Sequence, residues 1–188
     1  MKKEYKWGIV ATIIIGGIIV ATKKKKKPAI KSKYKSDDLN LLLPSFREKV
    51  KTLLANMIKK GYDPIPFDTG RTLAEQQKYY EKGTGAKPRP HGEHIVGAAV
   101  DIISGSSGWG DRKFFLALGK EAKTLGLTWG GNVKYGGDFI TKNDMPHIQA
   151  IPIKYQHEFE ALDTAKERDK YISDYFDSIE VTKKIPIV

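Results

Sequence analysis

The placement of the histidines is the sequence feature that most constrains this chain. Three of its four histidines lie in two short stretches, HGEHIVGAAVD at 91–101 and NDMPHIQA at 143–150. Each stretch combines an imidazole with a carboxylate and leads into an apolar run of strand length. Such a pattern fits either scattered surface residues or ligands that the fold brings together around a metal.

The chain of 188 residues contains no cysteine, which excludes disulfide bonds and thiolate metal sites. Any bound metal must therefore be held by nitrogen and oxygen ligands. With 40% apolar residues, the length allows one compact domain and short additional segments.

The net charge of +11 is concentrated at the N-terminus. Residues 1–35 contain eleven lysines and one glutamate, a net of +10, so residues 36–188 are almost neutral. A nucleic-acid-binding domain more often carries its basic patch on the folded part. We therefore expect no nucleic-acid partner.

An apolar segment at residues 7–22, WGIVATIIIGGIIVAT, is followed directly by five lysines. As a helix it would span roughly 24 Å, less than the ~30 Å hydrocarbon core, but interfacial aromatic residues and snorkelling lysines make a thinned span feasible. We expect residues 1–22 to be a membrane anchor, with a cleaved signal peptide as the alternative. Residues 23–36 are then a flexible basic tether.

Helical periodicity predicts three helices in the rest of the chain, at about 45–61, 72–83 and 111–125. Capping boxes begin the first two, at Ser45 and Thr72. Apolar runs of strand length lie between and after the helices, at 64–67, 98–103, 128–129 and 147–153.

These elements predict an α+β fold with a small antiparallel sheet and flanking helices. The domain should occupy residues 37–155, behind the N-terminal membrane segment. Residues 156–188 are predicted to form a helical extension and a tail, with no recognisable chemistry.

The predicted strands place the histidines near each other. Neighbouring strands lie about 4.8 Å apart, so antiparallel pairing would set Asp101 beside His147. The small residues at 97–99 would let the loop that bears His94 fold back onto them. Two imidazoles and one carboxylate would then form a three-ligand zinc site with an open fourth position. On spacing alone, exposed or hydrogen-bonded histidines remain an alternative.

Asp144 lies three residues before His147, and Pro146 keeps Met145 extended. This geometry would let Asp144 reach over the open position without being a ligand.

Four stretches occur in an order that characterises one protein family. They are GRTLAEQQKYYEKG (70–83), HIVGAAVDI (94–102), GLTWGG (126–131) and DMPHIQ (144–149). Over about residues 40–153, the chain resembles the zinc peptidases of the D-alanyl-D-alanine carboxypeptidase and L-alanyl-D-glutamate endopeptidase family, which includes many phage endolysins.

The resemblance implies an α+β fold, peptidoglycan stem peptides as the substrate, and a zinc ion (Zn2+) held by His94, Asp101 and His147. It also implies that Asp144 is the general base. Arg71 would polarise the scissile carbonyl or bind a substrate carboxylate. We expect the protein to act as a monomer.

One position departs from the family pattern. Gly92 stands two residues before the first metal histidine, where the family usually has serine. The departure affects the expected specificity more than metal binding. His91 is an additional histidine, which we expect to be an exposed loop residue rather than a competing ligand.

Together these features predict a zinc-dependent peptidoglycan peptidase. The stretches at 70–83 and 126–131 resemble the endopeptidase branch, which favours cleavage between L-Ala and D-Glu. A D-Ala-D-Ala carboxypeptidase is the alternative within the family, and a catalytically idle wall-binding or virion module is the alternative of another class. The presence of all ligands together with Asp144 favours the enzyme.

The lysine distribution and the location of the implied substrate predict opposite orientations for the expected anchor. Three lysines precede the apolar segment and eight follow it before residue 36, so the positive-inside rule places the domain in the cytoplasm. The implied substrate lies outside, and we expect the domain to face the periplasm or cell wall. A phage lysis enzyme that waits inside the membrane is the alternative.

Overall fold

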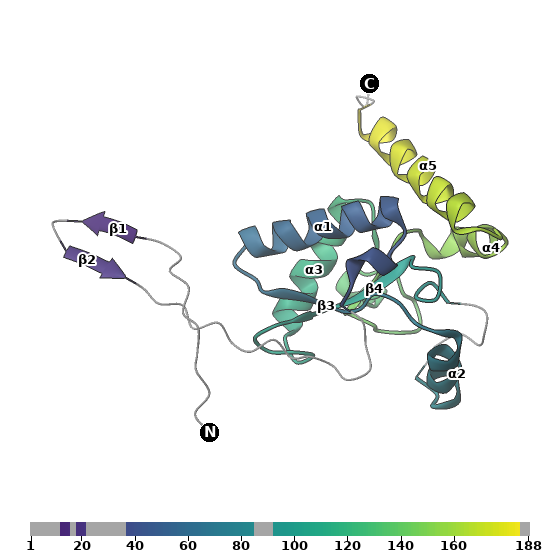
Figure 1. Cartoon of the computed structure of the whole chain (residues 1–188), viewed down its shortest axis with the longest axis horizontal. Helices are drawn as coiled ribbons and strands as arrows, with labels where there is room; N and C mark the ends of the chain where they lie inside the picture. The colour runs from purple at the N-terminus through teal and green to yellow at the C-terminus, as the bar shows by residue number, and fades with distance from the viewer. Residues whose placement is uncertain (1–11, 16–17, 22–36, 85–91, 185–188) are drawn as a thin grey trace. The chain divides into compact units, whose positions relative to one another are not determined.

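The computed structural model describes residues 12–15, 18–21, 37–84 and 92–184, and the chain divides into two compact units (Figure 1). In the first unit, residues 1–31, strand β1 (Thr12–Ile15) pairs antiparallel with β2 (Ile18–Ala21). Strands therefore occupy positions where the predicted anchor required a helix. Isoleucine and valine are β-branched and favour strands.

No helix in the described part of the chain has the length and apolar composition that crossing a membrane requires. The basic tether at 23–36 and the additional His91 lie outside the described residues. Membrane association through residues 7–22 and the orientation of the anchor stay predictions.

The second unit, residues 32–188, is built on a four-stranded antiparallel sheet in the order β3-β4-β6-β5. The strands are β3 (Pro64–Asp68), β4 (Ala99–Ser104), β6 (His147–Gln149) and β5 (Thr128–Trp129). They fall on the predicted runs, but β6 ends earlier than expected. Its run continues into a short 3-10 helix, η3 (Ile153–Tyr155), after Pro152, which has no N–H to donate to a ladder.

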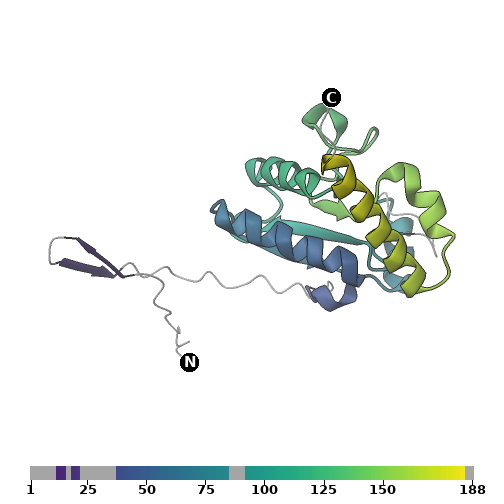
Figure 2. The same ribbon diagram turned by 90° about the horizontal axis from the view of Figure 1, so that it is seen from above.

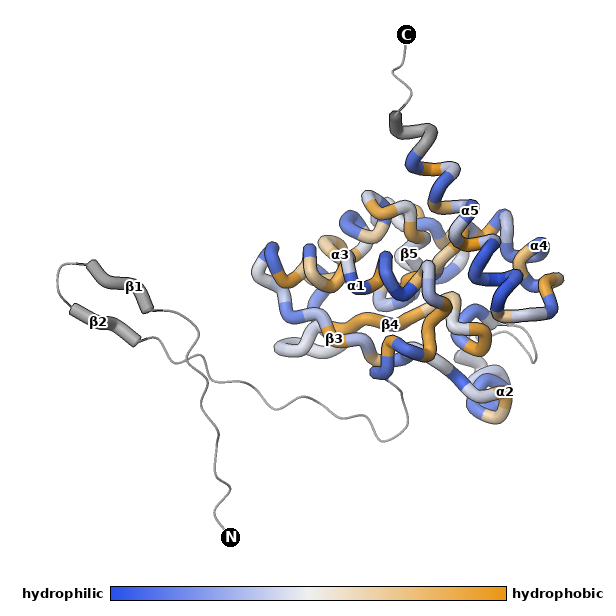
Figure 3. Tube along the Cα trace, turned by 45° about the horizontal axis from the view of Figure 1, so that its top comes forward, coloured by the Kyte–Doolittle hydropathy of each residue, from blue (hydrophilic) through white to orange (hydrophobic). Residues whose placement is uncertain are grey.

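Alternate residues of β4 and β6 face opposite sides of the sheet. Val100, Ile102 and Ile148 join the apolar core, and the tube along β4 is correspondingly apolar in Figure 3. Asp101 and His147 are direct partners in the antiparallel register and face the other side. The predicted juxtaposition of these two residues is confirmed.

Helices α1 (Pro44–Lys59) and α3 (Arg112–Thr124) cover the core face of the sheet and contact each other (Figure 2). Their apolar stripes supply fully buried side chains, each of which contributes roughly 1.5–3 kcal/mol of transfer free energy. These side chains are Phe46, Val50, Leu53, Met57, Phe114 and Leu118. Helix α2 (Leu73–Glu81) lies beyond the opposite face.

The two predicted capping boxes have different outcomes. Thr72 and Glu75 form the reciprocal bonds of a capping box at the start of α2, as predicted. The box at Ser45 is wrong, because α1 already begins at Pro44, a residue suited to the first turn. The Ser45 N–H instead donates to a carboxylate oxygen of Asp169, 2.8 Å away.

That bond is one of several that join the C-terminal part to the domain. Helices α4 (Gln156–Glu160) and α5 (Ala165–Lys184) contribute Phe159, Ile172 and Phe176 to the core shared with the sheet and α1. The sequence predicted a helical extension here, and the structure shows that its sparse apolar residues complete the core.

Replacement of Ile172 by alanine should therefore destabilise the whole domain. Ile172 is fully buried, so Ile172→Ala should lower the free energy of unfolding by about 2–5 kcal/mol. Urea unfolding of the full chain, followed by circular dichroism, measures the change. Lys170→Ala is the control, because Lys170 forms only an exposed ion pair with Asp174. Equal midpoints for the two variants would contradict this role of α5.

Candidate metal centre

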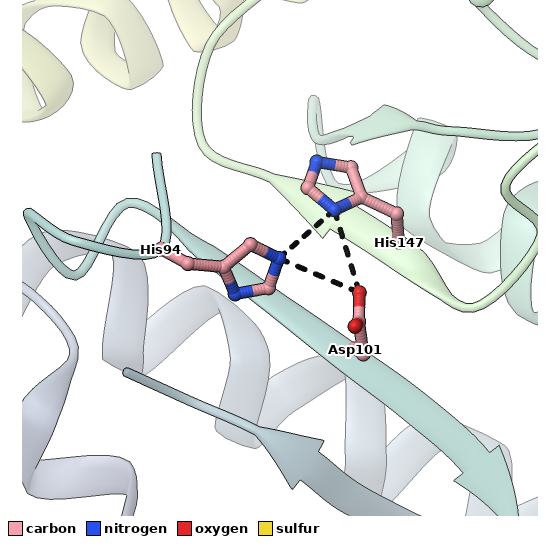
Figure 4. A group of neighbouring side chains, drawn as sticks. All are labelled: His94, Asp101 and His147. Atoms are coloured by element: carbon pink, nitrogen blue, oxygen red, sulfur yellow. Dashed lines mark hydrogen bonds and ion pairs between the residues drawn. The ribbon is translucent and has the colours of Figure 1, made fainter. Parts of the chain in front are cut away.

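Three side chains converge on the face of the sheet opposite the core (Figure 4). His94 Nε2 lies 3.2 Å from His147 Nδ1, and these nitrogens lie 3.5 and 3.4 Å from Asp101 Oδ1. All three residues are buried, yet Asp101 Oδ1 has no hydrogen-bond partner. An orphaned buried carboxylate oxygen facing two imidazole nitrogens fits a divalent cation. The predicted grouping of these three residues is present.

A tight turn positions His94 before β4. The Ala98 N–H donates to Glu93 O over 2.8 Å, and the Ile95 N–H donates to Gly92 O over 3.0 Å. These bonds fold the loop back toward the strand, as the small residues there predicted. The Arg71 N–H also donates to His94 O, which connects this turn to the segment after β3.

A second turn, from Asp144 to His147, is fixed by Gly130 and Trp129. The Gly130 N–H donates to His147 O, and the Asp144 N–H donates to Gly130 O, each over 2.8 Å. The Trp129 indole is buried in the core, and its Nε1–H donates to Met145 O over 2.7 Å. The buried Trp129 side chain therefore fixes the position of this turn relative to the sheet.

Gln149 determines which nitrogen of His147 is available. Its Nε2 donates to Ile151 O over 2.7 Å, so its Oε1 faces His147 Nε2 at 3.1 Å as an acceptor. The proton of a neutral His147 is then held on Nε2, and the lone pair on Nδ1 points at the cluster. His94 presents Nε2 instead, so the two ligands use different ring nitrogens.

The electrostatics of the cluster favour a cation. Burial raises the pKa of Asp101, but the charges of His94 and His147 outweigh it and hold that pKa well below its usual range. Burial lowers the pKa of His147, but the Asp101 carboxylate outweighs it and raises the pKa to about 9. A metal must displace that proton, so its affinity falls as the pH is lowered.

Asp144 lines the same cavity but is not part of the ligand group. Among the described residues, the ligand atoms within 4.8 Å of one another come from His94, Asp101 and His147. The cavity has a volume of about 670 Å³. Asp144 is an exposed residue, but partial desolvation in the cavity raises its pKa, while the His147 imidazole lowers it and the Asp101 carboxylate raises it further. This places an accessible carboxyl group of raised pKa beside the cluster.

Arg71 also lines the cavity, held by a buried partner rather than by a surface carboxylate. Its Nη2 donates to Asp68 Oδ2 over 2.6 Å, and its Nη1 donates to Gln76 Oε1 over 3.0 Å. The guanidinium carbon lies 4.6 Å from the centre of the Tyr79 ring. Gln76 is part of the same cavity wall.

The structure explains why position 92 is a glycine and not the serine that is usual in the family. Its φ is +147°, and a Cβ there would lie 2.7 Å from Gln76 Nε2. A serine would displace the Gln76 side-chain amide, whose oxygen accepts from Arg71. Gln76 can therefore keep this position only because residue 92 is glycine.

Two buried polar residues of the site were missed by sequence reasoning, Asp68 and Gln149. Gln149 lies two residues after His147 on a strand, a spacing that puts both on the same face. Asp68 lies three residues before Arg71, a spacing at which opposite charges can pair. Neither spacing is distinctive enough to identify a role by itself.

Comparisons with known proteins show what this chain is similar to. No protein-family model matches the chain. The chain is 28% identical over 130 residues to the peptidoglycan L-alanyl-D-glutamate endopeptidase CwlK of Bacillus subtilis, covering 59% of this chain and 74% of that protein. The resemblance to this peptidase family is confirmed.

Two solved structures are also similar to this chain. One is the L-Ala D-Glu endopeptidase ChiX of Serratia marcescens, at 20% identity and a TM-score of 0.45, covering 59% of this chain and 81% of that one. The other is VanYB in complex with D-alanine-D-alanine, at 16% identity and a TM-score of 0.49, covering 79% and 92%. Both structures are under 25% identical to this chain and have TM-scores below 0.5, so they carry no argument about its function.

The two histidines should be necessary for metal retention. His94→Ala and His147→Ala should each purify with almost no zinc, whereas His157→Ala, an exposed residue of α4, should keep about one ion. Elemental analysis of the purified full chain gives the metal content. Equal content in all three variants would exclude this centre. The expectation that His91→Ala keeps its zinc can be measured in the same series.

A side chain at position 130 should disturb the centre without unfolding the domain. A Cβ on Gly130 would lie 2.5 Å from Asp144 O and 2.9 Å from His147 Cβ, so Gly130→Ala must move the ligand turn. We expect zinc affinity to fall about tenfold or more. Gly110→Ala, where a Cβ meets only one atom at 3.7 Å, is the control for zinc titration. Unchanged affinity in Gly130→Ala would refute the role of this turn.

Proposed function

We propose that this chain is a zinc-dependent peptidoglycan peptidase that hydrolyses an amide bond of the stem peptide. The observation that carries the proposal is the buried group of His94, Asp101 and His147, with an orphaned carboxylate oxygen, in the wall of a large cavity. The similarity to CwlK supports the substrate class.

The donor set favours zinc. Two imidazole nitrogens and one carboxylate oxygen are ligands that zinc accepts, and three protein ligands leave a fourth position open, as in catalytic zinc sites. Zinc at such a site supplies Lewis-acid chemistry, polarising a carbonyl and lowering the pKa of a bound water from about 15.7 to about 7.

The remaining steps belong to side chains of this protein. Asp144 is accessible and has a raised pKa, which suits it to accept a proton from the attacking water and to deliver it to the leaving amine. Arg71 lines the same cavity and can stabilise the developing oxyanion or bind a substrate carboxylate.

The cavity has the size and the walls that a short peptide needs. Its volume of about 670 Å³ lies within the roughly 300–1,000 Å³ of typical ligand sites. Phe139, Ile140 and Ile153 form an apolar part of the lining, while Tyr79 lies under Arg71. A chain of small side chains and carboxylates fits this combination of apolar and cationic groups.

For the bond that is cut, we propose the one between L-Ala and D-Glu. The stretches at 70–83 and 126–131 support the endopeptidase branch, and the similarity to CwlK points the same way. Gly92 in place of the usual serine is a feature of this chain that affects recognition around Gln76.

The test is incubation of the full chain with purified peptidoglycan, followed by mass spectrometry of the new ends. A new N-terminal D-Glu with an L-Ala C-terminus supports the proposal. Release of free D-Ala with the L-Ala–D-Glu bond intact assigns the carboxypeptidase activity instead. If zinc-loaded protein binds peptidoglycan and releases nothing, the protein is an idle wall-binding module.

Replacement of Asp144 should separate catalysis from metal binding. Because Asp144 lies outside the ligand group, Asp144→Ala should keep its fold and its zinc, and hydrolysis should fall about 10²–10⁴-fold. Zinc content and turnover measured on the same preparation distinguish the two roles. Loss of zinc in this variant would make Asp144 a ligand and the proton-transfer role wrong.

A further inference from the structure

Asp68 occupies its place because β3 is irregular. The pairing of β3 with β4 shifts between Pro66 and Asp68, so that Phe67 is bulged and Asp68 lies opposite Asp101. The bulge brings the Asp68 side chain to the site, where it is 2% exposed. A buried carboxylate at the end of an edge strand requires a specific partner.

The two oxygens of Asp68 face two different parts of the site. Oδ2 accepts from Arg71 Nη2 over 2.6 Å, and Oδ1 lies 3.9 Å from His94 Nδ1. The first contact is a charge-assisted hydrogen bond between nearly buried groups. The second distance is longer than a hydrogen bond, so its effect on His94 is electrostatic.

The Asp68 charge lies beside the ring nitrogen of His94 that faces away from the cluster. Nε2 faces the metal cluster, while Nδ1 is buried and has no hydrogen-bond partner. A neutral histidine that donates Nε2 to a metal carries its proton on Nδ1, and a negative charge beside Nδ1 stabilises that tautomer.

For Arg71, the same carboxylate sets the direction of the guanidinium. Asp68 and Gln76 each accept from one terminal nitrogen, and the group stacks over Tyr79. The donors that remain are thereby held in a fixed plane in the cavity wall.

We propose that Asp68 is a positioning residue shared by both halves of the site: it orients Arg71 toward the substrate and holds His94 in the tautomer that binds metal. The part concerning Arg71 rests on the proposed peptidase function. The part concerning His94 rests only on the metal centre.

The two partners of this ion pair should affect metal binding differently. Asp68→Asn keeps the shape and removes the charge, so the zinc dissociation constant should rise about tenfold to a hundredfold. Arg71→Ala leaves the Asp68 carboxylate beside His94, so zinc affinity should not fall. Both variants should raise KM for stem peptide. Asp63→Asn is the matched control, an aspartate that accepts from Ser104 and Ser106 hydroxyl groups outside the cavity lining, and it should change neither quantity.

A purely structural ion pair would give another result. If Asp68→Asn and Arg71→Ala weaken zinc binding equally, or if Asp68→Asn leaves it unchanged, the proposal is wrong. The double variant Asp68→Asn/Arg71→Gln leaves no unpaired buried charge, and it should bind zinc as weakly as Asp68→Asn alone. If the wild-type chain hydrolyses no peptidoglycan but the zinc affinities follow this pattern, the proposed function fails and the role of Asp68 at His94 stands.

Discussion

The antiparallel register between β4 and β6 is the constraint on which the site depends. It makes Asp101 and His147 direct neighbours on one face and leaves Val100, Ile102 and Ile148 for the core on the other. Because side chains alternate along a strand, a slip of one residue would bury the ligands in the core and expose the apolar residues. The hydrophobic effect that folds the sheet therefore also aligns the metal ligands.

Polar contacts hold the remaining parts of the site in place relative to the paired strands β4 and β6. Gln149 fixes the orientation of His147, Gly130 holds the turn that bears Asp144, and Asp68 joins His94 to Arg71. Each of these residues lies on or beside a strand of the same sheet. The ligands are consequently held by the rigid part of the domain, while the cavity wall at Phe139 and Ile140 comes from a loop.

Much of this arrangement was predictable from the sequence. The periodicity of apolar residues identifies the strands, and the alternation of side chains along a strand identifies which residues share a face of the sheet. Two apolar runs and the strand spacing predicted that Asp101 and His147 are neighbours with His94 close to them, with exposed histidines as an alternative. The family resemblance then implied these three residues as the zinc ligands. The bulge at Phe67 was not predictable, since a single irregular residue leaves no trace in the pattern, and Asp68 was missed with it. The contribution of α5 was underestimated because few of its residues are apolar, although Ile172 and Phe176 reach the core. The cap at Ser45 failed because Pro44 already suits the first turn.

The central claim is that one metal ion is held by these three side chains. It is tested most directly by a crystal structure of the zinc-loaded full chain, with anomalous difference maps measured on both sides of the zinc absorption edge. The account predicts one peak bonded to His94 Nε2, His147 Nδ1 and Asp101 Oδ1, with Asp144 outside the coordination sphere. A peak elsewhere, or coordination through His147 Nε2, would contradict it.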